Sequence, residues 1–94
     1  MTTTTTVPLT LFAFTPGPGS SIEDHERVVQ VDDYRAGAIV RSFYRGDLAP
    51  IWEDLPLTDR RWLTDLGVTV ENAVDGRTGV HRQHLEAYAP DLIG

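Results

Sequence analysis

The sequence predicts a small single domain of the α+β class, with a short, mainly antiparallel sheet of two to four strands covered on one face by two or three helices. Some stretches alternate apolar and polar residues, as strands do, and others place apolar residues at the i, i+3 and i+4 spacing of a helix. The length of 94 residues allows one hydrophobic core. We expect this domain at residues 7–94, after a flexible polar N-terminus at residues 1–6.

The strands are predicted from alternation and from the residues that bound them. The first runs over Val7–Phe14, where a proline near the start favours an edge of the sheet and a stretch rich in proline and glycine follows as a turn. Ser20 and Glu23 have the spacing of a capping box, so a helical turn can begin there, although Val28–Val31 equally suits a strand. Val68–Val74 is predicted as a half-buried strand.

Three helices are predicted from apolar spacing and capping residues. The stretch Asp33–Tyr44 has one apolar helical face and ends before Gly46, which suits a left-handed C-cap. The alternative for residues 28–45 is a hairpin. A second helix is predicted over Leu57–Leu66, and a third after Thr78 as its N-cap. The predicted core consists of Leu9, Leu11, Ile39, Val40, Phe43, Trp62, Leu63, Leu66, Val70 and Leu85.

Charge and composition exclude several classes of function. Fourteen acidic and eight basic residues give a net charge of −6, which opposes binding to nucleic acid and to anionic lipid. The absence of cysteine excludes disulfide frameworks, thiolate zinc sites and cysteine nucleophiles. We find no secretory signal and no membrane-spanning stretch, so we expect a cytoplasmic protein. All basic residues are arginine, which indicates a GC-rich coding sequence, as in actinobacteria and their phages.

No motif predicts catalysis, and we expect a protein that is not an enzyme and needs no cofactor. Serine, threonine, histidine and carboxylate residues occur, but in no spacing typical of nucleophilic or acid–base catalysis. His81 and His84 have an i, i+3 spacing that can bring two imidazoles to one metal ion, with Glu86 or His25 as a third ligand. Because nothing else has matching spacing, we expect no metal site and interpret His84 as a core-facing side chain.

One stretch resembles the turn of a helix-turn-helix DNA reader. Leu63–Thr69 has the leucine, glycine, β-branched and hydroxyl pattern of that turn. The resemblance implies a recognition helix within Leu63–Arg82 and a regulator that binds DNA. Glu71 and Asp75 lie in this expected helix and oppose phosphate, so we treat DNA binding as the alternative function. A helix ended by Gly67 before a strand is the preferred interpretation.

The segment most indicative of function is the proline-flanked stretch Ile51–Leu55, a tryptophan and two aliphatic residues set among acids. Tryptophan is enriched at the centres of protein interfaces, and surrounding acids attract a basic partner surface. Trp52 would equally serve by closing one end of the core. We predict a partner-binding surface that consists of Asp47, Ile51, Trp52, Glu53, Asp54, Leu55 and Asp59.

These observations predict a small acidic protein that binds another protein, as an inhibitor, antitoxin, adaptor or phage accessory factor. Its acidic face could also imitate the phosphates of DNA and occupy the nucleic-acid site of a larger protein. The expected partner is a protein with a basic surface. A homodimer through the strand Val7–Phe14 is compatible with each of these functions, because an edge strand offers unpaired backbone groups to a second copy.

Overall fold

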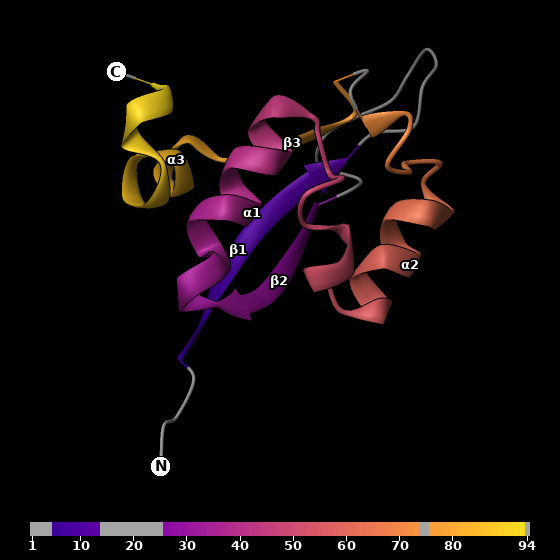
Figure 1. Cartoon of the computed structure of the whole chain (residues 1–94), viewed down its shortest axis with the longest axis horizontal. Coiled ribbons are helices and arrows are strands. Elements are labelled where there is room, and N and C mark those ends of the chain that lie inside the picture. The colour runs from indigo at the N-terminus through magenta and orange to yellow at the C-terminus, as the bar shows by residue number, and fades with distance from the viewer. Residues whose placement is uncertain (1–4, 14–25, 74–75, 94) are drawn as a thin grey trace.

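The structure is a computed structural model that describes residues 5–13, 26–73 and 76–93. Figure 1 shows its elements in chain order, which are β1 (Thr6–Ala13), β2 (Glu26–Asp32), α1 (Asp33–Arg45), the 3₁₀ turn η2 (Trp52–Asp54), α2 (Leu57–Asp65), β3 (Thr78–Val80), α3 (Arg82–Tyr88) and the 3₁₀ turn η4 (Pro90–Leu92). The predicted α+β class is confirmed, because a three-stranded antiparallel sheet packs against helices.

The sheet has the order β2-β1-β3, so β1 is its central strand and not the edge that the sequence predicted. β1 pairs with β2 from Thr6 to Phe12, and with β3 only from Leu11 to Ala13. The first half of β1 therefore has a strand on one side only, which is a position where Pro8 is tolerated. A homodimer through this strand would have only that first half available.

The described sheet begins before Val7, where we expected the domain to start. The backbone N–H of Asp33 donates to the carbonyl of Thr5 at 2.8 Å, which joins the start of α1 to the start of β1. Residues 1–4 of the predicted N-terminus lie outside the described residues. The same holds for Phe14 and for the predicted capping box at Ser20–Glu23.

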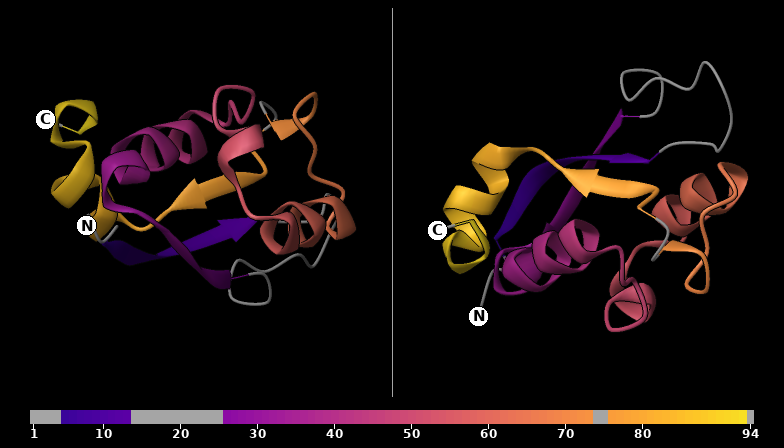
Figure 2. Two further views of the ribbon diagram at one scale, coloured as in Figure 1. Left: turned by 60° about the horizontal axis from the view of Figure 1, so that its bottom comes forward. Right: turned by 90° about the horizontal axis from the view of Figure 1, so that it is seen from above.

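Residues 28–45 form the end of β2 followed by α1, and not a hairpin. Figure 2 shows α1 on one face of the sheet, where it contacts all three strands. Its buried apolar stripe has the predicted helical spacing and includes Ile39, Val40 and Phe43. Gly46 ends the helix with φ of 73°, a left-handed conformation that glycine adopts without steric cost.

The core lies between α1 and the sheet and extends to both ends of the molecule. Of the predicted core residues, Trp62 and Leu66 are only partly buried against it. Val70 is half-buried and is not part of the core. The buried apolar residues are Leu9, Leu11, Ala13, Val29, Val31, Ala36, Ile39, Val40, Phe43, Leu48, Ile51, Leu55, Leu63, Val68, Ala73, Val80, Leu85 and Ala89.

The predicted strand Val68–Val74 is wrong, because the described part of this segment forms turns. Asn72 explains the difference, since its side chain bonds to the backbone of its own segment. The Thr69 N–H donates to Asn72 Oδ1 at 2.6 Å, and Asn72 Nδ2 donates to the Gly67 carbonyl at 2.8 Å. Such local bonds compete with the ladder bonds that a strand needs.

The third strand is Thr78–Val80, where we expected the N-cap of the last helix. The Thr78 hydroxyl donates to the Phe43 carbonyl at 3.3 Å, which fixes β3 to α1. The last helix therefore begins only at Arg82. α2 begins at Leu57, as predicted, and ends at Asp65, one residue before the predicted end.

Figure 1 places α2 and α3 at opposite ends of the molecule, with α1 and the sheet between them. Within the described residues, no helix has both the length and the apolar character needed to cross a membrane.

Gly79 is the position in the sheet where a side chain has no room. It lies opposite Phe12 in the β1–β3 pairing, and a Cβ at Gly79 would overlap the Phe12 ring. The Gly79→Ala variant should lose about 1–3 kcal/mol of unfolding free energy, the usual cost of overpacking, in chemical denaturation. Combined with Phe12→Leu, the loss should be smaller than the sum of the two single losses.

Gly76→Ala is the control for this prediction. Nothing lies within 4 Å of the position of its Cβ, so its cost comes only from a φ of +79°. A Gly79→Ala variant as stable as the wild type would contradict the placement of the Phe12 ring over β3.

Candidate functional site

The segment between α1 and α2 is held in place by successive short-range backbone bonds. The Ile51 N–H donates to the Leu48 carbonyl at 3.2 Å. The Asp54 N–H then donates to the Ile51 carbonyl at 2.9 Å, and the Leu55 N–H to the Trp52 carbonyl at 3.3 Å. These i, i+3 bonds form the 3₁₀ turn η2, and prolines on either side prevent a longer helix.

Two of the predicted partner-binding residues, Ile51 and Leu55, lie in the core. Each is only 2% exposed. Trp52 lies between them in the sequence and is partly buried, so it packs against the core with one side and faces solvent with the other. Trp52 therefore closes the core and is also accessible, which combines the two interpretations that the sequence allowed.

Three of the predicted acids lie on the surface around Trp52. The Glu53 side chain is 90% exposed, and its carboxylate lies 3.9 Å from Arg60 Nη1. Asp54 pairs with Arg35 at 3.2 Å on the surface. Asp47 is exposed, and its Oδ1 accepts the N–H of Ala49 at 3.3 Å. These three carboxylates can contact a partner.

Asp59 differs from the other predicted acids because it is buried. Its side chain is 8% exposed and accepts from Arg27 Nε at 2.9 Å, and the Arg27 guanidinium lies 5.9 Å from the centre of the Trp62 ring. Burial raises the pKa of the Asp59 carboxyl above its ordinary value of 3.8, and Arg27 opposes this rise. Asp59 therefore connects α2 to β2 and is not available to a partner.

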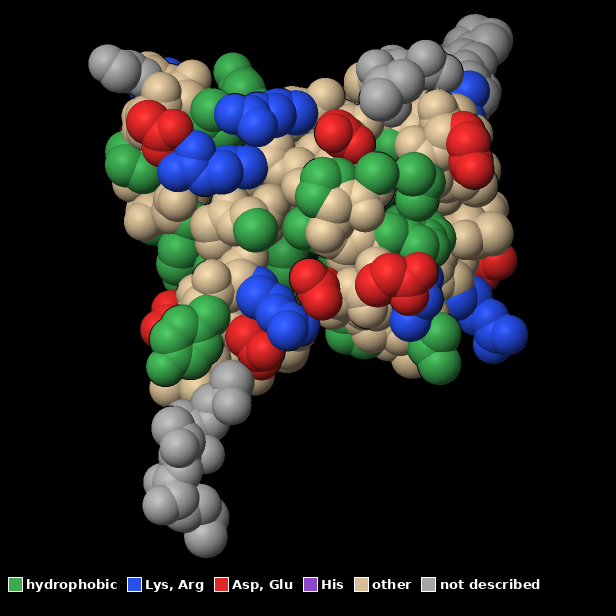
Figure 3. Space-filling view, in the orientation of Figure 1, with side chains coloured by type: hydrophobic (Ala, Val, Ile, Leu, Met, Phe, Trp, Pro, Cys, Tyr) green, Lys and Arg blue, Asp and Glu red, His purple; other side chains and the backbone are tan. Residues whose placement is uncertain are grey.

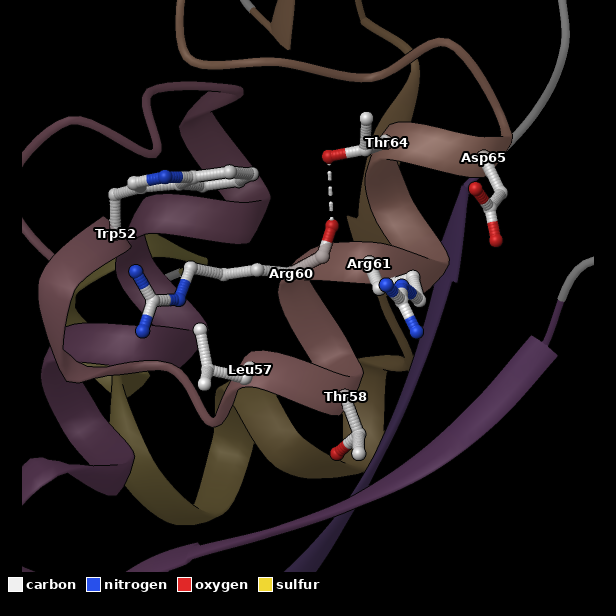
Figure 4. A pocket seen from close by; sticks show the side chains of 7 residues that line it. All are labelled: Trp52, Leu57, Thr58, Arg60, Arg61, Thr64 and Asp65. Atoms are coloured by element: carbon white, nitrogen blue, oxygen red, sulfur yellow. Dashed lines mark hydrogen bonds between the residues drawn. The ribbon is translucent and has the colours of Figure 1, made fainter.

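A hollow of about 550 Å³ lies beside Trp52, on the outer side of α2. Figure 4 shows the Arg60 guanidinium extending toward Trp52 and Leu57, while Arg61 lies farther from Trp52. Leu57 is 74% exposed. We call the residues that line this hollow the Trp52 surface, which consists of Trp52, Leu57, Thr58, Arg60, Arg61, Thr64 and Asp65.

The two arginines of the Trp52 surface differ in how firmly they are held. Arg60 Nε donates to the Leu55 carbonyl at 3.1 Å, which fixes its guanidinium beside the Trp52 ring. The Arg60 carbonyl in turn accepts the Thr64 hydroxyl at 2.8 Å. Arg61 is exposed, and in the described part of the chain it has no ion pair. Arg61 is therefore able to pair with an incoming carboxylate.

This arrangement suits binding. The hollow combines an aromatic wall, an exposed aliphatic side chain and charges of both signs, which are the features of a protein interface. Its hydroxyl groups belong to Thr58 and Thr64, and its lining contains no histidine that could serve as a base for them.

The described residues do not form the helix-turn-helix that Leu63–Thr69 resembles. α2 ends at Asp65, Gly67 has φ of +81°, and residues 68–73 form turns where a recognition helix would be needed. Arg77 of this region donates to the Gly67 carbonyl at 3.0 Å. The geometry needed to place a helix in the DNA major groove is therefore missing here.

His81 and His84 lie near each other at the start of α3, with ring centres 6.4 Å apart. His81 Nε2 contacts the Glu26 carboxylate at 3.0 Å, and His84 Nε2 accepts the backbone N–H of Thr10 at 3.1 Å. In the described residues, no three histidine or carboxylate side chains are grouped as metal ligands. His84 lies at the edge of the sheet and is not in the core.

Comparison of the chain with known protein families, with curated proteins and with solved structures finds no match.

Sequence reasoning missed Leu57, Arg60 and Arg61. All three belong to the predicted second helix, on the side opposite the residues expected to face the core. A leucine on the polar side of that helix was the signal that could have identified them, because an exposed leucine beside a tryptophan indicates an apolar patch. The hollow itself depends on how α2 packs beside η2, which a local pattern does not indicate.

The Asp59–Arg27 pair gives a prediction about pH. Because the folded state raises the pKa of Asp59 above its ordinary value of 3.8, the ionised carboxylate lowers stability relative to the neutral one. Wild-type protein should therefore lose unfolding free energy relative to Asp59→Asn as the pH rises from about 3 to about 7, in chemical denaturation. A relative gain over this range would mean that the ion pair outweighs burial.

Removing the Arg27 guanidinium should increase the loss of unfolding free energy that the ionised Asp59 carboxylate causes. In Arg27→Met the carboxylate stays buried without its guanidinium, so unfolding free energy at neutral pH should fall by about 1–3 kcal/mol. Combining Arg27→Met with Asp59→Asn should recover most of it, because the remaining amide is neutral. Equal stability of Arg27→Met and wild type would contradict the burial of this charge.

Proposed function

We propose that this chain is a non-enzymatic protein that binds another protein through the Trp52 surface. The hollow beside Trp52 carries the proposal, because partly buried Trp52 forms one of its walls and strongly exposed Leu57 another. Covering these two side chains with a partner removes apolar area from water, which favours association. Large aromatic side chains in such positions supply much of the binding energy at protein interfaces.

The charges around the Trp52 surface support a partner with basic residues. Figure 3 shows hydrophobic side chains gathered over the segment between α1 and α2, with acidic side chains at their margin. Asp47, Glu53 and Asp54 are the acids of this segment. A net charge of −6 adds a long-range attraction to a basic protein. Such attraction is expected to raise the association rate and to weaken with salt.

Arg60 and Arg61 give the same surface a positive side. A partner that meets the acids with basic residues and the arginines with a carboxylate would bind in one orientation only, because the reversed orientation brings like charges together. The partner that fits best therefore presents an apolar side chain for the hollow, with basic residues on one side of it.

An inhibitor, an antitoxin, an adaptor or a phage accessory factor would each use a surface of this kind, and the cytoplasm is where we expect it to act. If the protein is an inhibitor that imitates DNA, its carboxylates would occupy the positions where a nucleic-acid-binding protein holds phosphates. Direct DNA binding is not supported by the described geometry, so duplex DNA serves as a negative control.

Trp52→Ala is the variant that tests this function. A partner recovered from nuclease-treated lysate of a GC-rich actinobacterium should bind this variant at least about 30-fold more weakly than the wild type, a loss of about 2 kcal/mol. The melting temperature should also fall, because Trp52 packs against the core with one side, but the variant should stay folded at the temperature of the binding measurement. Titration calorimetry with the purified partner and a thermal melt measure the two effects.

Two further variants serve as a second test of the surface and as a control. Glu53→Lys changes a side chain that is 90% exposed, so it should weaken binding to a basic partner without affecting the melt. Tyr34→Ala removes an aromatic residue that is 86% exposed on α1 and should affect neither quantity. Unchanged binding by both Trp52→Ala and Glu53→Lys would overturn the proposal, as would recovery of DNA without a protein.

A further inference from the structure

The pairing of β1 with β3 ends at Leu11, which pairs with Val80, so Thr10 is the first residue of β1 beyond it. If the pairing of β1 with β3 continued, His81 would lie opposite Thr10. The strand ends there instead, because α3 begins at Arg82. His84 reaches back from the first turn of α3, and its Nε2 accepts the Thr10 N–H at 3.1 Å. An imidazole nitrogen thus takes the place that a strand carbonyl would have at this edge of β1.

This contact requires one form of the imidazole. Nε2 accepts the bond, so it carries no proton, and the proton of neutral His84 must lie on Nδ1. A proton on Nε2 would place its N–H against the N–H of Thr10. Protonated His84 therefore cannot keep the bond, and Thr10 would lose its partner at the sheet edge.

The surroundings of His84 do not stabilise a positive charge on its ring. His81, the residue before α3, lies beside it and contacts Glu26 of β2 at 3.0 Å, so this carboxylate is engaged by His81 and not by His84. The remaining charges on α3, those of Arg82 and Glu86, pair with each other at 3.1 Å. Among the described residues, no carboxylate forms an ion pair with His84 that would stabilise its cation.

Two further contacts of the C-terminal segment do not depend on the charge of a histidine. α1 meets η4 through a bidentate pair between Arg41 and Asp91, with both bonds at 2.6 Å. Leu85 of α3 and Ala89, the residue after this helix, are buried. These contacts would keep the C-terminal segment attached to α1 while the His84 bond to β1 is broken.

We propose that His84 is an acid-sensitive latch, whose protonation releases the start of α3 from the edge of β1 while the rest of the domain stays folded. Release uncovers the Thr10 N–H on a strand edge, where a further strand could pair. The device is separate from the Trp52 surface, which lies at the opposite end of the molecule (Figure 1).

The pH range of the latch follows from its environment. Burial, and to a lesser extent His81, hold the pKa of His84 below its ordinary value of 6.5. The unfolded chain then binds the proton more readily than the folded one. The stability that the closed latch contributes is complete above about pH 6.5 and is lost as the pH falls through the lowered pKa of the folded state.

Hydrogen exchange of single amides in the full chain tests the proposal. After correction for intrinsic rates, protection of the Thr10 amide should fall at least about tenfold between about pH 7.5 and about pH 5. Protection of the Val29 amide, in the strand pair β1–β2, should stay constant. Equal protection of Thr10 at both pH values would overturn the latch, and an equal loss at Val29 would show global unfolding in its place.

His84→Gln and His81→Gln form a matched pair of variants. Glutamine offers an acceptor oxygen but does not titrate. The pH-dependent loss of protection at the Thr10 amide should therefore disappear in His84→Gln and persist in His81→Gln. If the Thr10 amide of His84→Gln still lost protection at acid pH, the proposal would be overturned.

A second measurement needs no substitution. Nitrogen-15 NMR of the wild-type histidines at neutral pH should show His84 with its proton on Nδ1, as the bond from Thr10 requires. A proton on Nε2 would contradict the latch, even if His84→Gln fails to fold.

Discussion

The burial of Ile51 and Leu55 is the constraint on which the functional surface depends. A chain of 94 residues has few large apolar side chains, so the segment between α1 and α2 must contribute to the core, and both residues are only 2% exposed. They flank the 3₁₀ turn η2, and of the residues between them Trp52 is partly buried while Glu53 and Asp54 are exposed. The accessible position of Trp52 and the exposure of Glu53 are consequences of core packing, and they place an aromatic side chain among acids.

Charge in this protein is divided between structure and surface. Arg27, Arg35 and Arg41 each pair with a carboxylate that is distant in sequence, and these pairs connect α2 to β2, η2 to α1 and η4 to α1. The charges of these three arginines are therefore partly neutralised by carboxylates of the chain itself. The exposed pairs contribute little to stability, since solvent screens them. What remains on the surface is an excess of carboxylates, with Arg61 as a local exception beside the hollow.

Elements with a long periodic pattern could be predicted from the sequence, and those that depend on distant contacts could not. The apolar face of α1 and its Gly46 cap are local features, and the structure confirms both. The strand predicted at residues 68–74 failed because Asn72 satisfies the backbone there, and β3 was missed because its three residues are strands only through pairing with β1. At the site, the acids could be predicted, whereas the hollow arises from the packing of α2 beside η2.

The most direct test of the central claim is site-specific photocrosslinking from the Trp52 surface. A photoreactive phenylalanine analogue at position 57, where the leucine is 74% exposed, should form a covalent adduct with one partner protein in lysate. The same analogue at position 34, where the tyrosine is 86% exposed on α1, should not. Adducts at position 34 and none at position 57, in proteins with unchanged melting temperatures, would show that the contact surface lies elsewhere.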